Sequence, residues 1–75
     1  MTKQEVLETI TEYSEWNLAI SKYAILNNLD EEDTNENRKQ LDKILKELKD
    51  EGIIGVFQIY GDDNHFRGRG YALND

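Results

Sequence analysis

The sequence predicts a small α+β domain in which three helices precede a C-terminal β-hairpin. Two observations favour this order. Residues 35–51 repeat apolar side chains at helical spacing and stop at a glycine. Residues 53–60 and 66–73 are then rich in β-branched and aromatic residues and flank a turn cluster at 61–65. With 75 residues and no repeat, linker or low-complexity segment, we expect one domain spanning residues 1–75.

The helix predicted at residues 35–51 has the clearest signals. Its apolar residues form one stripe that can be buried: Leu41, Ile44, Leu45 and Leu48. Asp33 or Thr34 can serve as its N-cap. Gly52 can take the positive φ of a residue that follows a helix end, so the helix should stop near Asp50 or Glu51.

The opposite face of this helix is polar and cationic. Its candidate DNA-binding residues are Asn35, Arg38, Lys39, Lys43 and Lys46. One interpretation is a helix that lies in a DNA groove, with its cations on phosphates. The other is a solvated face with ion pairs within the helix, namely Asp42 with Lys46, Lys43 with Glu47 and Lys46 with Asp50. On charge alone, the solvated face is the favoured interpretation.

The predicted hairpin has a simple expected register. Pairing Tyr60 with Phe66 places Gly55 opposite Tyr71 and Ile53 opposite Leu73. Tyr71 would then cover a glycine gap, and Leu73 would close the core.

Two arginines lie nearer the tip of this hairpin. Arg67 and Arg69 fall where the ribbon should outrun the body of so small a domain. We therefore expect both side chains to reach a partner.

Eight residues of the returning strand carry a resemblance to a known family: Phe66-Arg67-Gly68-Arg69-Gly70-Tyr71-Ala72-Leu73. They resemble the end of the OmpR/PhoB-type winged-helix domain, whose hairpin commonly reads Val-Arg-Gly-x-Gly-Tyr-x-Leu/Phe. A helix followed directly by a two-stranded ribbon is also the layout of a winged helix. The resemblance implies a small winged helix in which Arg67 reaches the DNA minor groove and Tyr71 packs into the core. It covers the hairpin and little else.

The N-terminal residues predict a first helix over 3–14. Thr2 and Glu5 have the spacing of a capping box. An apolar stripe follows, made of Val6, Leu7, Ile10 and Tyr13. An acidic face lies outside it, made of Glu8, Glu12 and Glu15. This face is either a solvated surface or an electrostatic dock for a basic partner protein.

Residues 16–20 alternate apolar with small or polar side chains. They predict a short first strand that pairs with the hairpin, with Trp16, Leu18 and Ile20 facing the core. A helix beginning at Asn17 is the competing interpretation. Ser21 can then cap a second helix that ends at Leu29, with an inward stripe made of Tyr23, Ile25, Leu26 and Leu29.

The net charge of −7 is unevenly distributed. Residues 1–37 contain two lysines and nine acidic residues, whereas residues 38–75 contain seven cations and seven acidic residues. An acidic chain repels nucleic acid at long range and has little non-specific affinity for it. The absence of cysteine, of a signal-peptide pattern and of a long apolar run favours a cytoplasmic protein that does not span a membrane.

No catalytic or metal-binding constellation stands out. His65 is the only histidine, and there is no cysteine. The acidic run at 30–33 does not fit a Ca²⁺ loop, because Asn35 occupies the glycine position and Leu41 the position of the bidentate glutamate. We expect no enzyme, no cofactor and no metal.

The sequence thus predicts a small winged-helix DNA-binding protein, a transcriptional regulator of bacterial or phage character. Duplex DNA is the expected partner, contacted by the helix residues above and by Arg67 and Arg69. The alternative is a protein–protein interaction module that uses the acidic N-terminal half and does not bind DNA. A homodimer is expected in the first case, because one such module offers a small interface.

Overall fold

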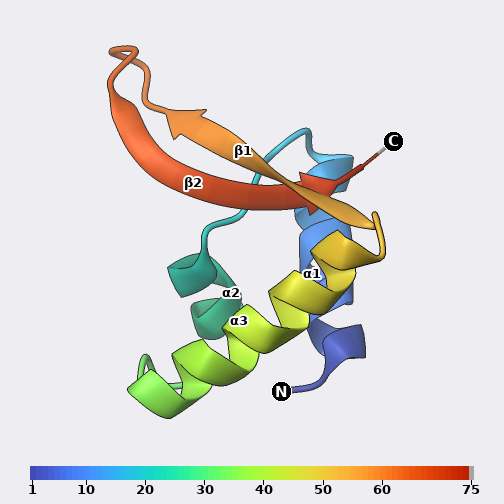
Figure 1. Ribbon diagram of the computed structural model, residues 1–75. Helices are drawn as coiled ribbons and strands as arrows, with labels where there is room; N and C mark the ends of the chain where they lie inside the picture. Colours follow the sequence, from blue (N-terminus) through green and yellow to red (C-terminus); the bar gives the residue numbers. More distant parts are fainter. Residues whose placement is uncertain (75) are drawn as a thin grey trace.

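The computed structural model describes residues 1–74 and consists of three helices followed by an antiparallel hairpin (Figure 1). In chain order these elements are α1 (Lys3–Glu15), α2 (Lys22–Asn28), α3 (Asn35–Asp50), β1 (Ile54–Tyr60) and β2 (Phe66–Leu73). This is the predicted α+β architecture, and it is compatible with a winged helix. Among residues 1–74, none of the helices combines the length and the apolar character needed to cross a lipid bilayer.

The helices begin at the caps that the sequence predicted. The side chains of Thr2, Ser21 and Thr34 each accept a hydrogen bond from the backbone N–H three residues further on. At α1 the Glu5 side chain also accepts from the backbone of Thr2, which completes the capping box. Directly after α3, Gly52 has a φ of +75°. Glycine has no Cβ and adopts this angle without strain, so the helix can end here.

The core lies between the three helices and the base of the hairpin. It consists of Val6, Ile10, Ile20, Ile25, Leu26, Leu41, Ile44, Leu45, Leu48 and Ile54. The stripes predicted for α1 and α3 are confirmed, with Leu7 and Tyr13 partly buried at the edge. The inward placement predicted for Tyr23 is wrong, because 62% of this residue is exposed. Ile25 and Leu26 are the buried residues of this short helix, and Ala24 and Leu29 are partly buried against the core beside them.

The predicted first strand at residues 16–20 is reduced to one β-bridge, between Ile20 and Tyr71. Helix α1 continues to Glu15, and Asn17 then takes a left-handed conformation with φ of +58°. This reversal breaks the two-residue alternation on which the prediction depended. Trp16 and Leu18 are therefore 74% and 55% exposed, and their predicted core placement is wrong.

The hairpin register also departs from the prediction. Tyr60 pairs with Phe66 as expected, and their rings meet edge to face with centroids 5.9 Å apart. The register then shifts by one residue between Ile59 and Tyr60, which is a β-bulge at Arg67. Gly55 consequently lies opposite Ala72 rather than opposite Tyr71.

The base of the hairpin nevertheless closes the core as expected. Ile54, rather than Ile53, lies opposite Leu73 because of the bulge. Ile54 is buried, and Tyr71 and Leu73 are partly buried against the core. The far end of the hairpin projects beyond the helices (Figure 1).

Candidate nucleic-acid interface

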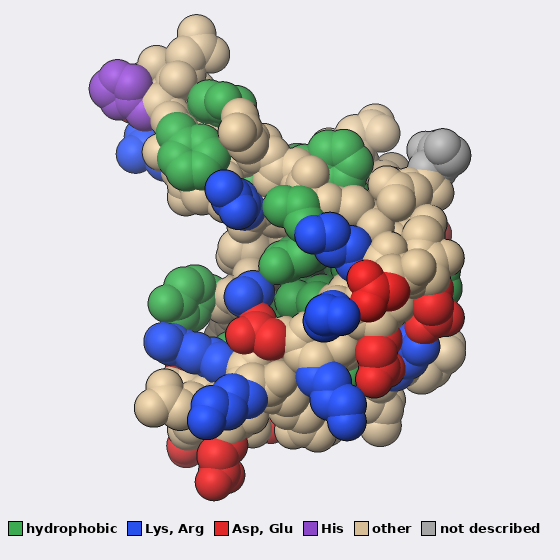
Figure 2. Space-filling model, viewed as in Figure 1, with side chains coloured by type: hydrophobic (Ala, Val, Ile, Leu, Met, Phe, Trp, Pro, Cys, Tyr) green, Lys and Arg blue, Asp and Glu red, His purple; other side chains and the backbone are tan. Residues whose placement is uncertain are grey.

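The hairpin, α2 and α3 enclose one concave face, visible as the hollow between hairpin and helices in Figure 2. Three adjoining depressions of about 180, 250 and 320 Å³ make up this face, and Lys22 lines all of them. The cations that line the concave face are Lys22, Arg38, Lys46, Lys49, Arg67 and Arg69. Among residues 1–74, the acidic residues that line it are Asp33 and Asp42.

The local sequence explains how these cations come together. Arg38, Lys46 and Lys49 lie on the side of α3 that borders its buried stripe, and their spacing of eight and three residues keeps them on one face. On β2, Arg69 and Tyr71 are two residues apart and point to the same side of the sheet. The bulge leaves Arg67 beside the same depression.

Arg38 is the most constrained of the predicted residues. Its Nη2 donates a hydrogen bond to Asp33 Oδ2 at 2.8 Å, and its Nε bonds the other carboxylate oxygen. The guanidinium carbon lies 5.3 Å from the centre of the exposed Tyr23 ring, within range of a cation–π contact. The hydrogen bonds to Arg38 lower the pKa of Asp33, and the same bonds raise the pKa of Arg38. These contacts hold the Arg38 guanidinium in place at the end of the concave face that α2 and α3 form.

Lys22 forms an ion pair that joins two helices. Its Nζ contacts Asp42 on α3, and the hydrogen bond to that carboxylate raises the pKa of Lys22. Further along α3, Lys46 pairs with Asp50 at 3.1 Å. Of the three pairs predicted within α3, the structure contains this one, because Asp42 is engaged by Lys22 and Glu47 lies near Lys3 of α1.

The two hairpin arginines differ in their surroundings. Arg67 Nη2 donates to Asp63 Oδ2 at 3.0 Å, within the turn. His65 Nδ1 lies 3.2 Å from the same carboxylate oxygen. Arg69 is exposed and has no ion-pair partner among residues 1–74. Arg69 is therefore the arginine of the hairpin that can engage an external anion without first releasing a carboxylate.

The structure divides the predicted site residues into two groups. Arg38, Lys46, Arg67 and Arg69 line the concave face. Asn35, Lys39 and Lys43 are exposed on α3 but line none of its depressions. The helical positions of Lys39 and Lys43 place them on the outward stripe of α3, beside the stripe that faces the hairpin.

Sequence reasoning missed Lys22, Tyr23 and Lys49 as residues of the concave face. Lys22 and Tyr23 lie in the first turn of α2, directly after its cap Ser21. Ile25 and Leu26 hold the opposite side of this short helix in the core, so its first turn points outward. A single helical turn is too short for the spacing of apolar residues to indicate which way the side chains of Lys22 and Tyr23 point.

The charge distribution on this surface differs from that of the whole chain. Six of the nine Lys and Arg residues line the concave face, although the chain has 16 acidic residues and a net charge of −7. Four of these six cations form ion pairs with carboxylates, so among residues 1–74 Lys49 and Arg69 are the two that line the face without such a partner. Comparison with protein-family models, curated protein sequences and solved structures finds no match to this chain.

Proposed function

We propose that this chain is a winged-helix protein that binds duplex DNA through the concave face and α3, and that it acts as a transcriptional regulator. The observation that carries the proposal is the gathering of six cations from α2, α3 and the hairpin on one concave surface. If these cations served only to make the surface polar, there would be no reason for six of the nine in an acidic chain to line the same face.

The shape of this surface supports duplex DNA as the ligand. An α-helix with its side chains is about 10–12 Å wide and fits the major groove, which is about 12 Å wide. In that position Lys39, Lys43 and Lys46 would face the groove, because residues three, four and seven apart share one side of a helix. Lys49 would lie nearer the hairpin, and the hairpin would lie over the neighbouring minor groove.

The residue types suit these roles. Lysine acts as a point charge on phosphates, whereas arginine is the better ligand in a minor groove or on guanine. Arg69 is the first candidate for the hairpin contact, because among residues 1–74 no acid neutralises it. Asn35, in the first turn of α3, is the polar side chain best suited to a base edge.

The test is fluorescence anisotropy of labelled random-sequence duplex DNA with the wild-type protein and with Arg67→Ala/Arg69→Ala, at two salt concentrations. We expect binding that weakens with salt, by a slope of about −0.9 per phosphate contacted. The double variant should lose most of this affinity. Lys3→Ala is a control for charge, because Lys3 lies on α1 in ion pairs with Glu47 and Glu51, away from the concave face.

Two outcomes would count against the proposal. The first is an absence of binding at low salt by a protein whose circular dichroism shows it to be folded. The second is an equal loss of affinity in the Lys3→Ala control and in the hairpin variant, which would indicate a response to net charge alone.

A further inference from the structure

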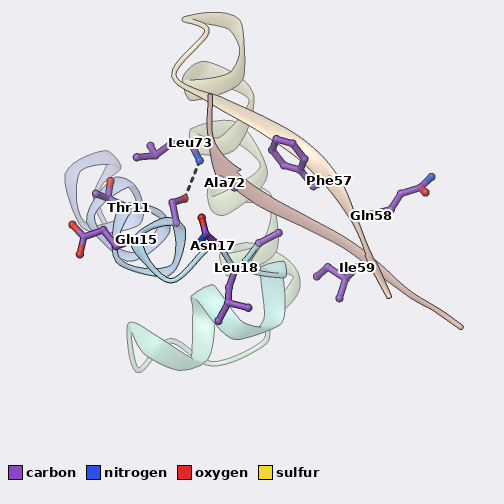
Figure 3. A pocket seen from close by; sticks show the side chains of 11 residues that line it. Thr11, Glu15, Asn17, Leu18, Phe57, Gln58, Ile59, Ala72 and Leu73 are labelled. Atoms are coloured by element: carbon purple, nitrogen blue, oxygen red, sulfur yellow. Dashed lines mark hydrogen bonds between the residues drawn. The ribbon is translucent and has the colours of Figure 1, made fainter. Parts of the chain in front are cut away.

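A second hollow lies between α1 and the side of the hairpin that faces away from the concave face (Figure 3). We call it the α1–hairpin groove, and its volume is about 580 Å³. This is within the range of about 300–1,000 Å³ that is typical of binding pockets. Its apolar lining consists of Leu18, Ala19, Phe57, Ile59, Ala72 and Leu73.

Strand alternation separates this groove from the concave face. Phe57 and Ile59 project from β1 on the side of Leu18, whereas Gln58 points away (Figure 3). Val56 and Tyr71 line the concave face instead. The two surfaces therefore occupy opposite sides of the same two strands, and one can be filled while the other is in use.

The apolar lining is accessible at the surface. Leu18 is 55% exposed and Phe57 is 44% exposed. Leu18 projects here because Asn17, in its left-handed conformation, turns the chain out of α1. At the end of the groove the Ser14 hydroxyl accepts a hydrogen bond from the Leu73 N–H at 3.0 Å. These two polar groups are thus paired with each other, so an apolar ligand can cover them at little cost.

The rim of the groove on the α1 side is acidic. Glu15 lines the groove itself, and Glu8, Glu12 and Glu15 line an adjoining depression of about 340 Å³ on the outer face of α1. In the described part of the chain, no lysine or arginine lines either hollow. These three glutamates also form no ion pair with any of residues 1–74. The groove therefore combines an apolar floor with uncompensated negative charge along one side.

We propose that the α1–hairpin groove docks an amphipathic helix of a partner protein, one that carries Lys or Arg beside its apolar stripe. Apolar residues at helical spacing would cover Leu18 and Phe57, and the flanking cations would meet Glu12 and Glu15. A partner that bound instead as an extended strand along the edge of the hairpin would leave this face of the sheet uncovered. A helix packed across the face buries it, as in other two-layer arrangements of helix and sheet.

A second copy of this chain is a poorer occupant. A two-fold dimer brings the same patch of both protomers together, so the glutamates of one rim would meet those of the other. Like charges placed opposite each other disfavour such an interface. A basic partner has the complementary charge, and its binding does not depend on whether the concave face binds DNA.

The probe is a fluorescein-labelled synthetic amphipathic helix of leucine and lysine, about 15 residues long, since shorter isolated helices are marginal in water. A peptide of the same pattern with glutamate in place of lysine is the matched control. Binding is followed by anisotropy of the label. Trp16, the only tryptophan of the chain and 74% exposed in the turn beside the groove, gives a second signal from the protein itself.

We expect the leucine–lysine peptide to bind and the leucine–glutamate peptide not to bind. Leu18→Ser and Phe57→Ser should each weaken binding by about tenfold or more, as expected for central apolar anchors. Glu12→Gln/Glu15→Gln should weaken it and reduce its dependence on salt.

A charge-matched control distinguishes the groove from general attraction to an acidic protein. Glu32→Gln/Glu36→Gln removes the same charge at the α2–α3 connection and the start of α3. The proposal is overturned if this pair weakens peptide binding as much as the α1 pair, or if Leu18→Ser and Phe57→Ser have no effect. Sedimentation that shows a dimer of the wild type, lost in Leu18→Ser, would also overturn it by making a second copy the occupant.

Discussion

Ile20 and Tyr71 exchange two backbone hydrogen bonds, with N–O distances of 2.9 Å from Ile20 to Tyr71 and 2.8 Å in return. This single bridge joins the α1–α2 connection to β2 near the base of the hairpin. Ala19 consequently lies directly against Gly70. The bridge fixes the hairpin relative to the helices, and with it the shapes of the concave face and of the α1–hairpin groove.

Gly70→Ala should destabilise the fold. A Cβ atom at this position would lie 2.7 Å from Ile59 Cδ1, 2.9 Å from Ala19 Cβ and 3.1 Å from the Ala19 carbonyl carbon. Because Ala19 is held by the bridge, the hairpin must move to relieve the overlap. We expect the free energy of unfolding in urea to fall by about 1–3 kcal/mol, the usual cost of overpacking. Adding Ala19→Gly should recover part of the loss, and an unchanged stability of the single variant would contradict this account.

Ser14→Ala should also reduce the free energy of unfolding. The hydroxyl accepts from the Leu73 N–H, so its removal leaves a partly buried donor without a partner, at a cost of about 1–3 kcal/mol. Thr11→Ala is the matched control, since the Thr11 hydroxyl donates only to the carbonyl one turn earlier in α1. Its effect should stay within about 0.5 kcal/mol. Equal effects of the two substitutions on chemical denaturation would show that the link to Leu73 contributes little.

The two hairpin arginines should contribute unequally to DNA binding. Arg67 must release Asp63 before it can contact DNA, whereas Arg69 has no such partner among residues 1–74. Arg69→Ala should therefore weaken binding by a larger factor than Arg67→Ala in the anisotropy assay. Asp63→Asn should strengthen binding, because it frees Arg67 and removes a negative charge near the hairpin tip. The opposite ranking of the two arginines would instead support the role that the family resemblance assigns to Arg67.

The carboxyl group of Asp33 should titrate below its ordinary pKa of 3.8, because Arg38 donates hydrogen bonds to it. A lowered pKa in the folded state means that the pair stabilises the fold at pH values above 3.8. This contribution is lost as the pH falls through the lowered pKa. Side-chain carboxyl NMR titration measures the shift directly. In Arg38→Ala the pKa of Asp33 should return toward its ordinary value, and a pKa that does not change would exclude Arg38 as the cause.

Local signals in the sequence were sufficient to predict the three helices and the two strands. Caps at Thr2, Ser21 and Thr34, together with the stop at Gly52, placed each helix end to within about one residue. These signals are sufficient because capping hydrogen bonds and periodic burial act within a few residues of the chain. Four of the seven predicted site residues also line the concave face: Arg38, Lys46, Arg67 and Arg69.

The errors occurred where distant segments meet. The bulge at Arg67 shifted the pairing of the hairpin, and the turn at Asn17 exposed Trp16 and Leu18, which had been assigned to the core. Neither feature follows from alternation alone, because a single left-handed or extra residue reverses which side every later residue faces. The turn at Asn17 also places Leu18 in the α1–hairpin groove.

The sequence by itself determined the three helices, the hairpin and the apolar stripes, because each depends on hydrogen bonds and burial among near neighbours. The tertiary structure decided which surfaces those elements present. It placed Lys22 and Tyr23 opposite the hairpin, paired Lys22 with Asp42 and Arg67 with Asp63, and left Leu18 exposed beside Phe57. Such relationships join residues far apart in the chain, or depend on one backbone angle, and therefore appear only when the chain is folded.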